Sequence, residues 1–151
     1  MQLKTLDLEI IAWLRRWFLP LARVAIFIVY FYFGILKLFG ESPASPLAHA
    51  LVNQTIGSAH FNLAFNLLAI YECVVGVLFL IPKATRLVIP LLVIHVIIVC
   101  SPLVLVPHLA WVGPFVPTLE GQYIIKNVAI IALAIGIAAQ TPPLKTKRGK
   151  A

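Results

Sequence analysis

The sequence predicts an all-α integral membrane protein, a four-helix bundle with an N-terminal interfacial amphipathic helix. Of its 151 residues, 62% are hydrophobic and 11% are charged, and the mean hydropathy is +1.02. A soluble domain is nearer about 45–50% apolar and about 25% charged. Four apolar runs approach the roughly 20 residues that a helix needs to cross a bilayer. These runs use more than half of the chain, so residues 1–151 are expected to form a single membrane domain.

Residues 3–18 precede the first long apolar run and are predicted to form a helix that lies along the membrane surface. Large apolar residues recur there at helical spacing and share one face: Leu6, Ile10, Trp13 and Trp17. Tryptophan rings on such a face suit the depth of the lipid headgroups. Pro20 is expected to break this helix from the first span, because proline cannot donate a helical hydrogen bond.

The predicted spans cover about residues 21–39, 61–81, 87–105 and 123–139. Residues 82–86 make so short a turn that the second and third spans must be antiparallel neighbours. Pro90 and Pro102 are expected to kink the third span. Ser45 before Pro46 indicates a short helix in the loop that follows the first span.

Lysine and arginine are distributed unevenly between the two sides of the predicted bundle. They occur in the N-terminal segment, in the turn 82–86 and in the tail 140–151, whereas the loops 40–60 and 106–122 have none. The positive-inside rule therefore places both termini and the short turn in the cytoplasm. The net charge of +7 is explained by basic residues beside the spans, which contact anionic lipid headgroups, and no nucleic-acid partner is expected.

Glu72 is the most informative single residue, because it lies near the middle of the second span. A carboxylate at that depth costs roughly 2.5 kcal/mol or more on insertion scales, so it is expected to face the protein interior and to have a partner. Candidate partners lie in or at the ends of other apolar runs: Arg23, Lys37, His95 and Lys126.

A rise of about 1.5 Å per helical residue predicts two polar layers in the bundle. The layer near the midplane comprises Tyr30, Glu72 and His95, with Arg23 as a candidate to reach Glu72 from the cytoplasmic side. The outer layer comprises Lys37, Lys126 and His60, with Glu41 and Glu120 just outside it. For each of these residues a purely structural role stays open: anchoring or snorkelling at an interface, or fixing the register of the helices.

The cysteines and histidines give no sign of a metal or heme protein. Cys73 and Cys100 are far apart in the sequence and form no CxxC motif, so neither a disulfide framework nor a metal site is expected. His95 is the histidine in mid-span, and without a second axial ligand no heme is expected.

Three segments together carry a recognisable combination of motifs. They are FGILKLF at 33–39, Glu72 followed by Gly76 and then PKATR at 82–86, and GQYIIKN at 121–127. This combination resembles the DoxX-like superfamily of small bacterial four-helix membrane proteins, and the stretch 34–46 is similar to its YkgB-like branch. The resemblance covers roughly residues 20–140 and implies a bundle in the bacterial inner membrane. It points to these polar positions: Arg23, Lys37, Glu72, Arg86 and Lys126.

The resemblance also implies a function, since related families have been linked to quinone-coupled sulfur oxidation, thiol and oxidative stress systems, and reactive-chlorine resistance. The first hypothesis is a redox- or stress-associated subunit that binds a quinone-like amphiphile or an anion among its buried charges, beside a soluble or membrane redox partner. Two alternatives stay open: a small transporter or proton or ion pathway, and a structural accessory subunit. Paired redox cysteines are missing from the sequence, which argues against the chain being the thiol-oxidising component itself. A stand-alone enzyme is not expected, and the oligomeric state is left open.

Overall fold

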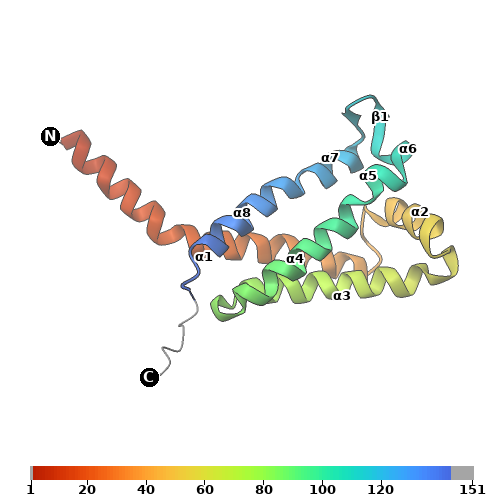
Figure 1. Ribbon diagram of the computed structural model, residues 1–151, viewed down its shortest axis with the longest axis horizontal. Helices are drawn as coiled ribbons and strands as arrows, with labels where there is room; N and C mark the ends of the chain where they lie inside the picture. The colour runs from red at the N-terminus through yellow and green to blue at the C-terminus, as the bar shows by residue number, and fades with distance from the viewer. Residues whose placement is uncertain (1, 144–151) are drawn as a thin grey trace, which may run out of the picture.

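The computed structural model describes residues 2–143 and shows a mostly helical protein built around long, roughly parallel or antiparallel helices (Figure 1). Within these residues, four helical segments are long and apolar enough to cross a membrane: Leu3–Leu38, Ser58–Phe79, Pro82–Leu105 and Leu119–Ala139. The prediction of four helices that are long and apolar enough to cross a membrane is therefore confirmed. The basic residues of the predicted tail, which are Lys145, Lys147, Arg148 and Lys150, lie outside the described residues.

The long helices are α1 (Gln2–Leu38), α3 (Phe61–Phe79), α4 (Thr85–Cys100) and the consecutive pair α7 (Leu119–Ile125) and α8 (Asn127–Ala139). We call the end of the bundle that holds the turn η2 (Pro82–Ala84) and the C-terminus of α8 the basic end. The opposite end, which we call the loop end, holds these elements: α2 (Ser45–Thr55), η1 (Ser58–His60), α5 (Pro102–Leu105), α6 (Pro107–Ala110), β1 (Trp111–Gly113) and β2 (Val116–Pro117). The short helix predicted near Ser45 is confirmed as α2, with a proline in its first turn.

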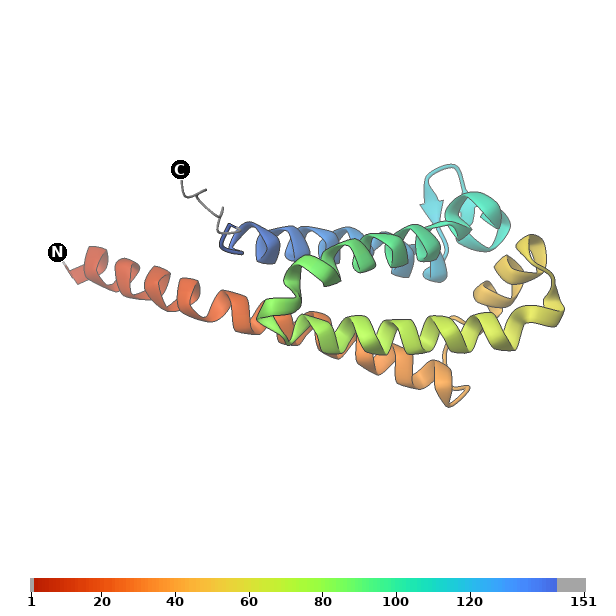
Figure 2. The same ribbon diagram turned by 60° about the horizontal axis from the view of Figure 1, so that its bottom comes forward.

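The predicted break at Pro20 is wrong, because α1 continues through it as one helix of 37 residues. Proline removes the hydrogen bond to the carbonyl of Arg16, and a helix supported by intact turns on both sides bends at such a site instead of ending. Figures 1 and 2 show α1 changing direction near this point, so that its first half leaves the bundle. In that first half, residues 3–18 are exposed on all faces.

Helices α1 and α3 form the most extensive helix pair of the bundle, and two glycines allow it. A Cβ atom on Gly34 would lie 2.6 Å from the Sγ atom of Cys73 and 2.8 Å from the carbonyl oxygen of Ala69. A Cβ atom on Gly76 would lie 3.1 Å from the backbone nitrogen of Phe31. Small residues at such contacts let two backbones approach closely, so side chains from α1 and α3 also meet at short range.

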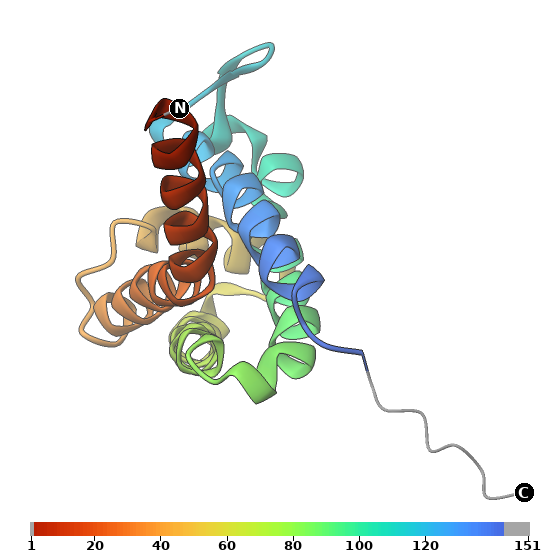
Figure 3. The ribbon, with the colours of Figure 1, turned by 90° about the vertical axis from the view of Figure 1, so that its left-hand side faces the viewer.

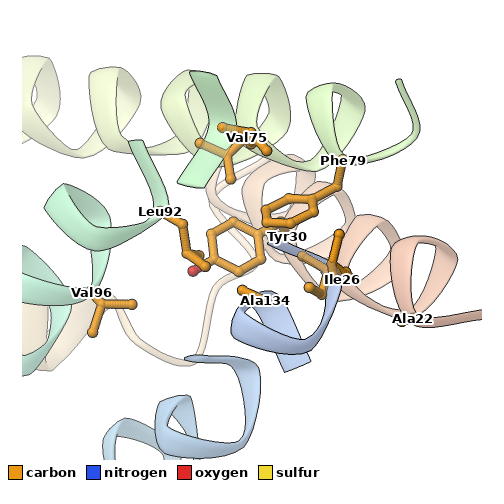
Figure 4. Packing of buried hydrophobic residues seen from close by; sticks show 10 residues of the cluster. Ala22, Ile26, Tyr30, Val75, Phe79, Leu92, Val96 and Ala134 are labelled. Atoms are coloured by element: carbon orange, nitrogen blue, oxygen red, sulfur yellow. The ribbon is translucent and has the colours of Figure 1, made fainter. Parts of the chain in front are cut away.

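An apolar core fills the space between α1, α3, α4 and α8. Figure 4 shows its side chains converging from these helices: Ala22, Ile26, Tyr30, Val75, Phe79, Leu92, Val96 and Ala134. A second, smaller core cluster lies at the loop end and comprises Leu47, Val106 and Ile124. Many large apolar side chains on the outside of the helices remain exposed, among them Leu63, Leu67, Ile97 and Val128. Such a surface suits contact with lipid.

The prolines of the third span behave differently from one another. Pro90 lies inside α4 without ending it, whereas Pro102 opens the separate helix α5. After α6, the strands β1 and β2 pair antiparallel as a small hairpin, which is a departure from the all-α prediction. Figure 3, which looks along the bundle, shows this hairpin projecting sideways beyond the helices. The Oγ1 atom of Thr118 accepts a hydrogen bond from the backbone nitrogen of Gly121 and so caps α7.

Candidate functional site

Glu72 faces the protein interior and is only 5% exposed. It lies on the buried face of α3, which also carries Ala69, Val75 and Gly76. One carboxylate oxygen, Oε2, accepts a hydrogen bond from the Nζ atom of Lys37 at 2.6 Å. The other, Oε1, lies 3.0 Å from the Nε2 atom of His95. Both oxygens of this buried carboxylate are therefore occupied by partners from other helices.

His95 extends the hydrogen-bond chain to a fourth side chain. Its Nδ1 atom lies 3.0 Å from the hydroxyl oxygen of Tyr30, and the centroids of these two rings are 4.9 Å apart. Tyr71 stacks on the imidazole with an interplanar angle of 9° and donates its hydroxyl hydrogen to the carbonyl oxygen of Leu91 at 2.8 Å. We call Lys37, Glu72, His95 and Tyr30 the buried polar cluster.

With Glu72 ionised, the hydrogen bonds of the buried polar cluster have one consistent set of donors and acceptors. A carboxylate only accepts hydrogen bonds, so the Nε2 atom of a neutral His95 must carry the hydrogen that it donates to Glu72. The Nδ1 atom is then an acceptor, and the hydroxyl of Tyr30 is the donor. With the Lys37 ammonium against the Glu72 carboxylate, the cluster is balanced in charge.

The structure brings Tyr30, Glu72 and His95 together in one layer, as the depth count predicted. It also corrects the position of Lys37, which was expected in the outer layer. Side chains on a helix tilt toward its N-terminus. Because α1 and α3 are antiparallel, Lys37 leans toward the basic end and Glu72 leans toward the loop end. The two side chains therefore meet between the depths of their own Cα atoms.

The predicted outer polar layer of Lys37, Lys126 and His60 is wrong. Lys126 is exposed, and its Nζ atom lies over the ring of Tyr123, 4.5 Å from the centroid. His60 is exposed as well and bonds through Nδ1 to the carbonyl of Ile56 in its own segment. Glu41 and Glu120 are also exposed. Charged groups near the end of a bundle stay solvated unless a buried partner offsets their desolvation, and Lys37 has such a partner in Glu72.

Arg23 does not reach Glu72, so this predicted contact is wrong too. Its guanidinium instead joins α1 to the turn between α3 and α4. It donates to the carbonyl oxygen of Phe79 at 2.9 Å and to the Oγ1 atom of Thr85 at 2.7 Å. Because an arginine side chain presents several donors in one plane, it can satisfy the otherwise free carbonyl at the end of α3. Arg23 therefore holds the basic end of the bundle together.

Apolar side chains separate the buried polar cluster from the basic end. Ile26, Phe79 and Val88 are almost completely buried there, between the cluster and the contacts of Arg23. Among the described residues, no buried side-chain nitrogen or oxygen lacks a hydrogen-bond partner. No group of three or more His, Cys, Asp or Glu side chains in the described part of the chain could hold a metal ion.

Two contributors to the site carried no signal in the sequence. In the sequence, Tyr71 is an ordinary aromatic residue of an apolar span. In the structure, its ring stacks on that of His95. Thr85 opens α4 and binds the guanidinium of Arg23, but a threonine after a turn is most often a local hydrogen-bonding residue. Only the packing of the helices shows that these side chains border the polar groups.

Comparison with family models, with curated proteins and with solved structures finds no match to the chain. The resemblance to the DoxX-like superfamily therefore stays a prediction from the sequence motifs.

Proposed function

We propose that the protein is a small, redox- or stress-associated membrane subunit in which the buried polar cluster exchanges protons with a quinone-like amphiphile. The observation that carries this proposal is the hydrogen-bond chain from Lys37 through Glu72 and His95 to Tyr30. All four side chains are at most 8% exposed. Ionisable residues at membrane depth are rare and usually functional.

The chain of hydrogen bonds can accept one proton without moving any heavy atom. A proton that arrives at the oxygen of Tyr30 displaces the hydroxyl hydrogen onto Nδ1 of His95. The hydrogen on Nε2 then passes to Oε1 of Glu72, which becomes a neutral carboxylic acid beside the Lys37 ammonium. The cluster gains one positive charge, and the reverse transfer releases the proton. Histidine suits this role because one ring nitrogen can donate a hydrogen while the other accepts one.

Quinone chemistry supports the choice of an amphiphile as the proton-exchanging ligand. Quinone oxygens accept hydrogen bonds, and their reduction consumes protons together with electrons, which a redox partner would supply. The half-buried Tyr71 stacks on His95, so aromatic surface leads from the cluster toward the outside of the bundle. A flat apolar ring entering from lipid would meet this surface first.

The placement of the protein in a membrane is part of the same proposal. The apolar sides of the four long segments support insertion in a membrane, and the resemblance to the DoxX-like superfamily implies the bacterial inner membrane. Exposed Lys83 and Arg86 lie at the basic end, which supports a cytoplasmic position for that end and for both termini. The first half of α1 would lie at the inner interface, where its exposed apolar residues and its arginines suit the headgroup region.

A conducting pathway is the less favoured alternative, because the apolar core separates the buried polar cluster from the basic end. A proton pathway across the membrane would need polar groups or water in that region. A purely structural accessory subunit would use the cluster only to fix the packing of α1, α3 and α4.

Thermal unfolding with and without an added short-chain quinone tests the proposal in purified, detergent-solubilised protein. A ligand at about 100 times its Kd stabilises the folded state by about 2.7 kcal/mol. We expect a quinone-dependent rise in Tm for the wild type and its loss in Tyr30→Phe. Tyr32→Phe is the matched control, because Tyr32 lies on the same helix and is 58% exposed.

Two further results would decide between the alternatives. If neither oxidised nor reduced quinone shifts the Tm of the wild type, the amphiphile proposal fails. Proton flux into proteoliposomes that disappears in Glu72→Gln but persists in Glu41→Gln would then favour a pathway. Absence of both effects, with a destabilised Glu72→Gln variant, would favour a structural subunit.

A further inference from the structure

An open groove lies at the basic end, away from the buried polar cluster, where α1 bends out of the bundle. It has a volume of about 510 Å³ and is lined by Leu14, Arg15 and Phe18 of α1 and by Gln140 at the end of α8. Helix α1 bends near Pro20, at a point close to the end of α8, and its first half then extends away from the bundle (Figure 1). The groove is therefore a product of the continuous, bent helix.

The floor of the groove is built by a contact between the two helices. A Cβ atom on Gly136 would lie 3.2 Å from the Cζ atom of Phe18, so the glycine lets the phenyl ring lie against α8. Leu14 is one helical turn before Phe18 and shares its face, and Leu21 continues that face toward the bundle. Leu14 and Leu21 are more than half exposed. One side of the groove thus merges with the apolar surface of α1.

The polar residues that line the groove are the cationic Arg15 and the amide Gln140, and no acidic residue among those described lines it. Arg15 forms no ion pair with any of the described residues. The ion pairs found among these residues both involve Glu72, which lies inside the bundle and away from the groove. A guanidinium presents a planar set of donors that matches a phosphate group. Gln140 adds an amide donor and an acceptor. A ligand that fits must therefore carry an anionic phosphate next to an apolar body.

We propose that this groove binds one anionic phospholipid, with its phosphate on Arg15, its glycerol region beside Gln140, and the first part of an acyl chain along Leu14 and Phe18. The volume lies within the range of about 300–1,000 Å³ that is typical of small-molecule sites. The site is distinct from the general attraction of basic residues to an anionic surface, because one guanidinium and one amide define it. Bound lipid fills the angle between the two helices.

Native mass spectrometry of the detergent-solubilised protein, titrated with phosphatidylglycerol or with phosphatidylcholine of the same acyl chains, tests the site. We expect one phosphatidylglycerol to bind more tightly than phosphatidylcholine, and Arg15→Gln to weaken it about fivefold. Gln140→Leu, on the other side of the groove, should weaken it as well. Arg16→Gln is the matched control, since it removes the same charge one residue away and outside the groove lining.

Equal weakening by Arg15→Gln and Arg16→Gln would show only diffuse attraction between charges and would overturn the proposal. Unchanged binding in both Arg15→Gln and Gln140→Leu would overturn it too. A third arm adds inorganic phosphate to the protein that already carries one phosphatidylglycerol. If phosphate displaces the lipid, the groove is a site for a free anion and the assignment to a phospholipid is wrong.

Discussion

Replacing Lys37 by methionine removes the cation of a buried ion pair and keeps an unbranched side chain of similar length. The ammonium nitrogen and the carboxylate oxygen of Glu72 are 2.6 Å apart, and both side chains are less than a tenth exposed. At an effective dielectric constant of 20, their attraction is about 6 kcal/mol. Desolvation offsets much of it, but removing one partner of a buried pair still costs about 3–5 kcal/mol, because the other charge is left uncompensated.

We therefore expect Lys37→Met and Glu72→Gln each to lower the free energy of unfolding by about 3–5 kcal/mol. The double variant Lys37→Met/Glu72→Gln should lose much less free energy of unfolding than the sum of the two single losses, because neither charge is left without its partner. The assay is a double-mutant cycle, with unfolding in mixed micelles followed by helical circular dichroism.

Matched control substitutions for this cycle are Lys126→Met and Glu41→Gln, at exposed positions. Each control should change stability by at most about 0.5 kcal/mol, and the two should be additive. If Lys37→Met and Glu72→Gln are also additive, the two side chains are not paired in the folded protein. The description of the buried polar cluster would then be wrong.

Two other predictions concern how the helices are held together. Gly34→Ala should lower the free energy of unfolding by about 1–3 kcal/mol in the same assay, because a Cβ atom there overlaps α3. Gly113→Ala is its control, since a Cβ atom at Gly113 meets nothing within 4 Å. Equal effects of the two substitutions would contradict the close contact between α1 and α3. Arg23→Met should lower stability by about 1–3 kcal/mol, since the carbonyl of Phe79 and the hydroxyl of Thr85 lose a donor. An Arg23→Met variant as stable as the wild type would show that this contact does not hold the basic end.

The helical segments could be predicted from the sequence because each depends on a long, local signal. The run 61–81 is apolar throughout, and α3 occupies nearly the same residues, Phe61–Phe79. Depth along a helix is also local, since it follows from the rise per residue. For this reason the meeting of Glu72 and His95 could be predicted before any coordinates were known.

The remaining features depend on the direction in which side chains point and on how the helices pack. Neither follows from the number of residues along a helix. The contact of Lys37 with Glu72 follows from the tilt of side chains toward the helix N-terminus, which brings the ammonium and carboxylate groups to a common depth between their Cα atoms. Pro20 bends α1 without ending it, because the turns before and after it are intact. The contacts of Arg23 depend on where the turn after α3 brings Phe79 and Thr85, and this is a property of the whole bundle.

Both ends of the buried polar cluster are carried by the same helix. Tyr30 and Lys37 lie two turns apart on α1, while the groups between them, Glu72 and His95, come from α3 and α4. A shift of α1 by one residue would move it about 1.5 Å along its axis and turn it by about 100°. The hydrogen bonds from Tyr30 to His95 and from Lys37 to Glu72 would then break together. The cluster is thus intact or broken as a unit, and it reports the register of α1, whose bent first half extends beyond the bundle.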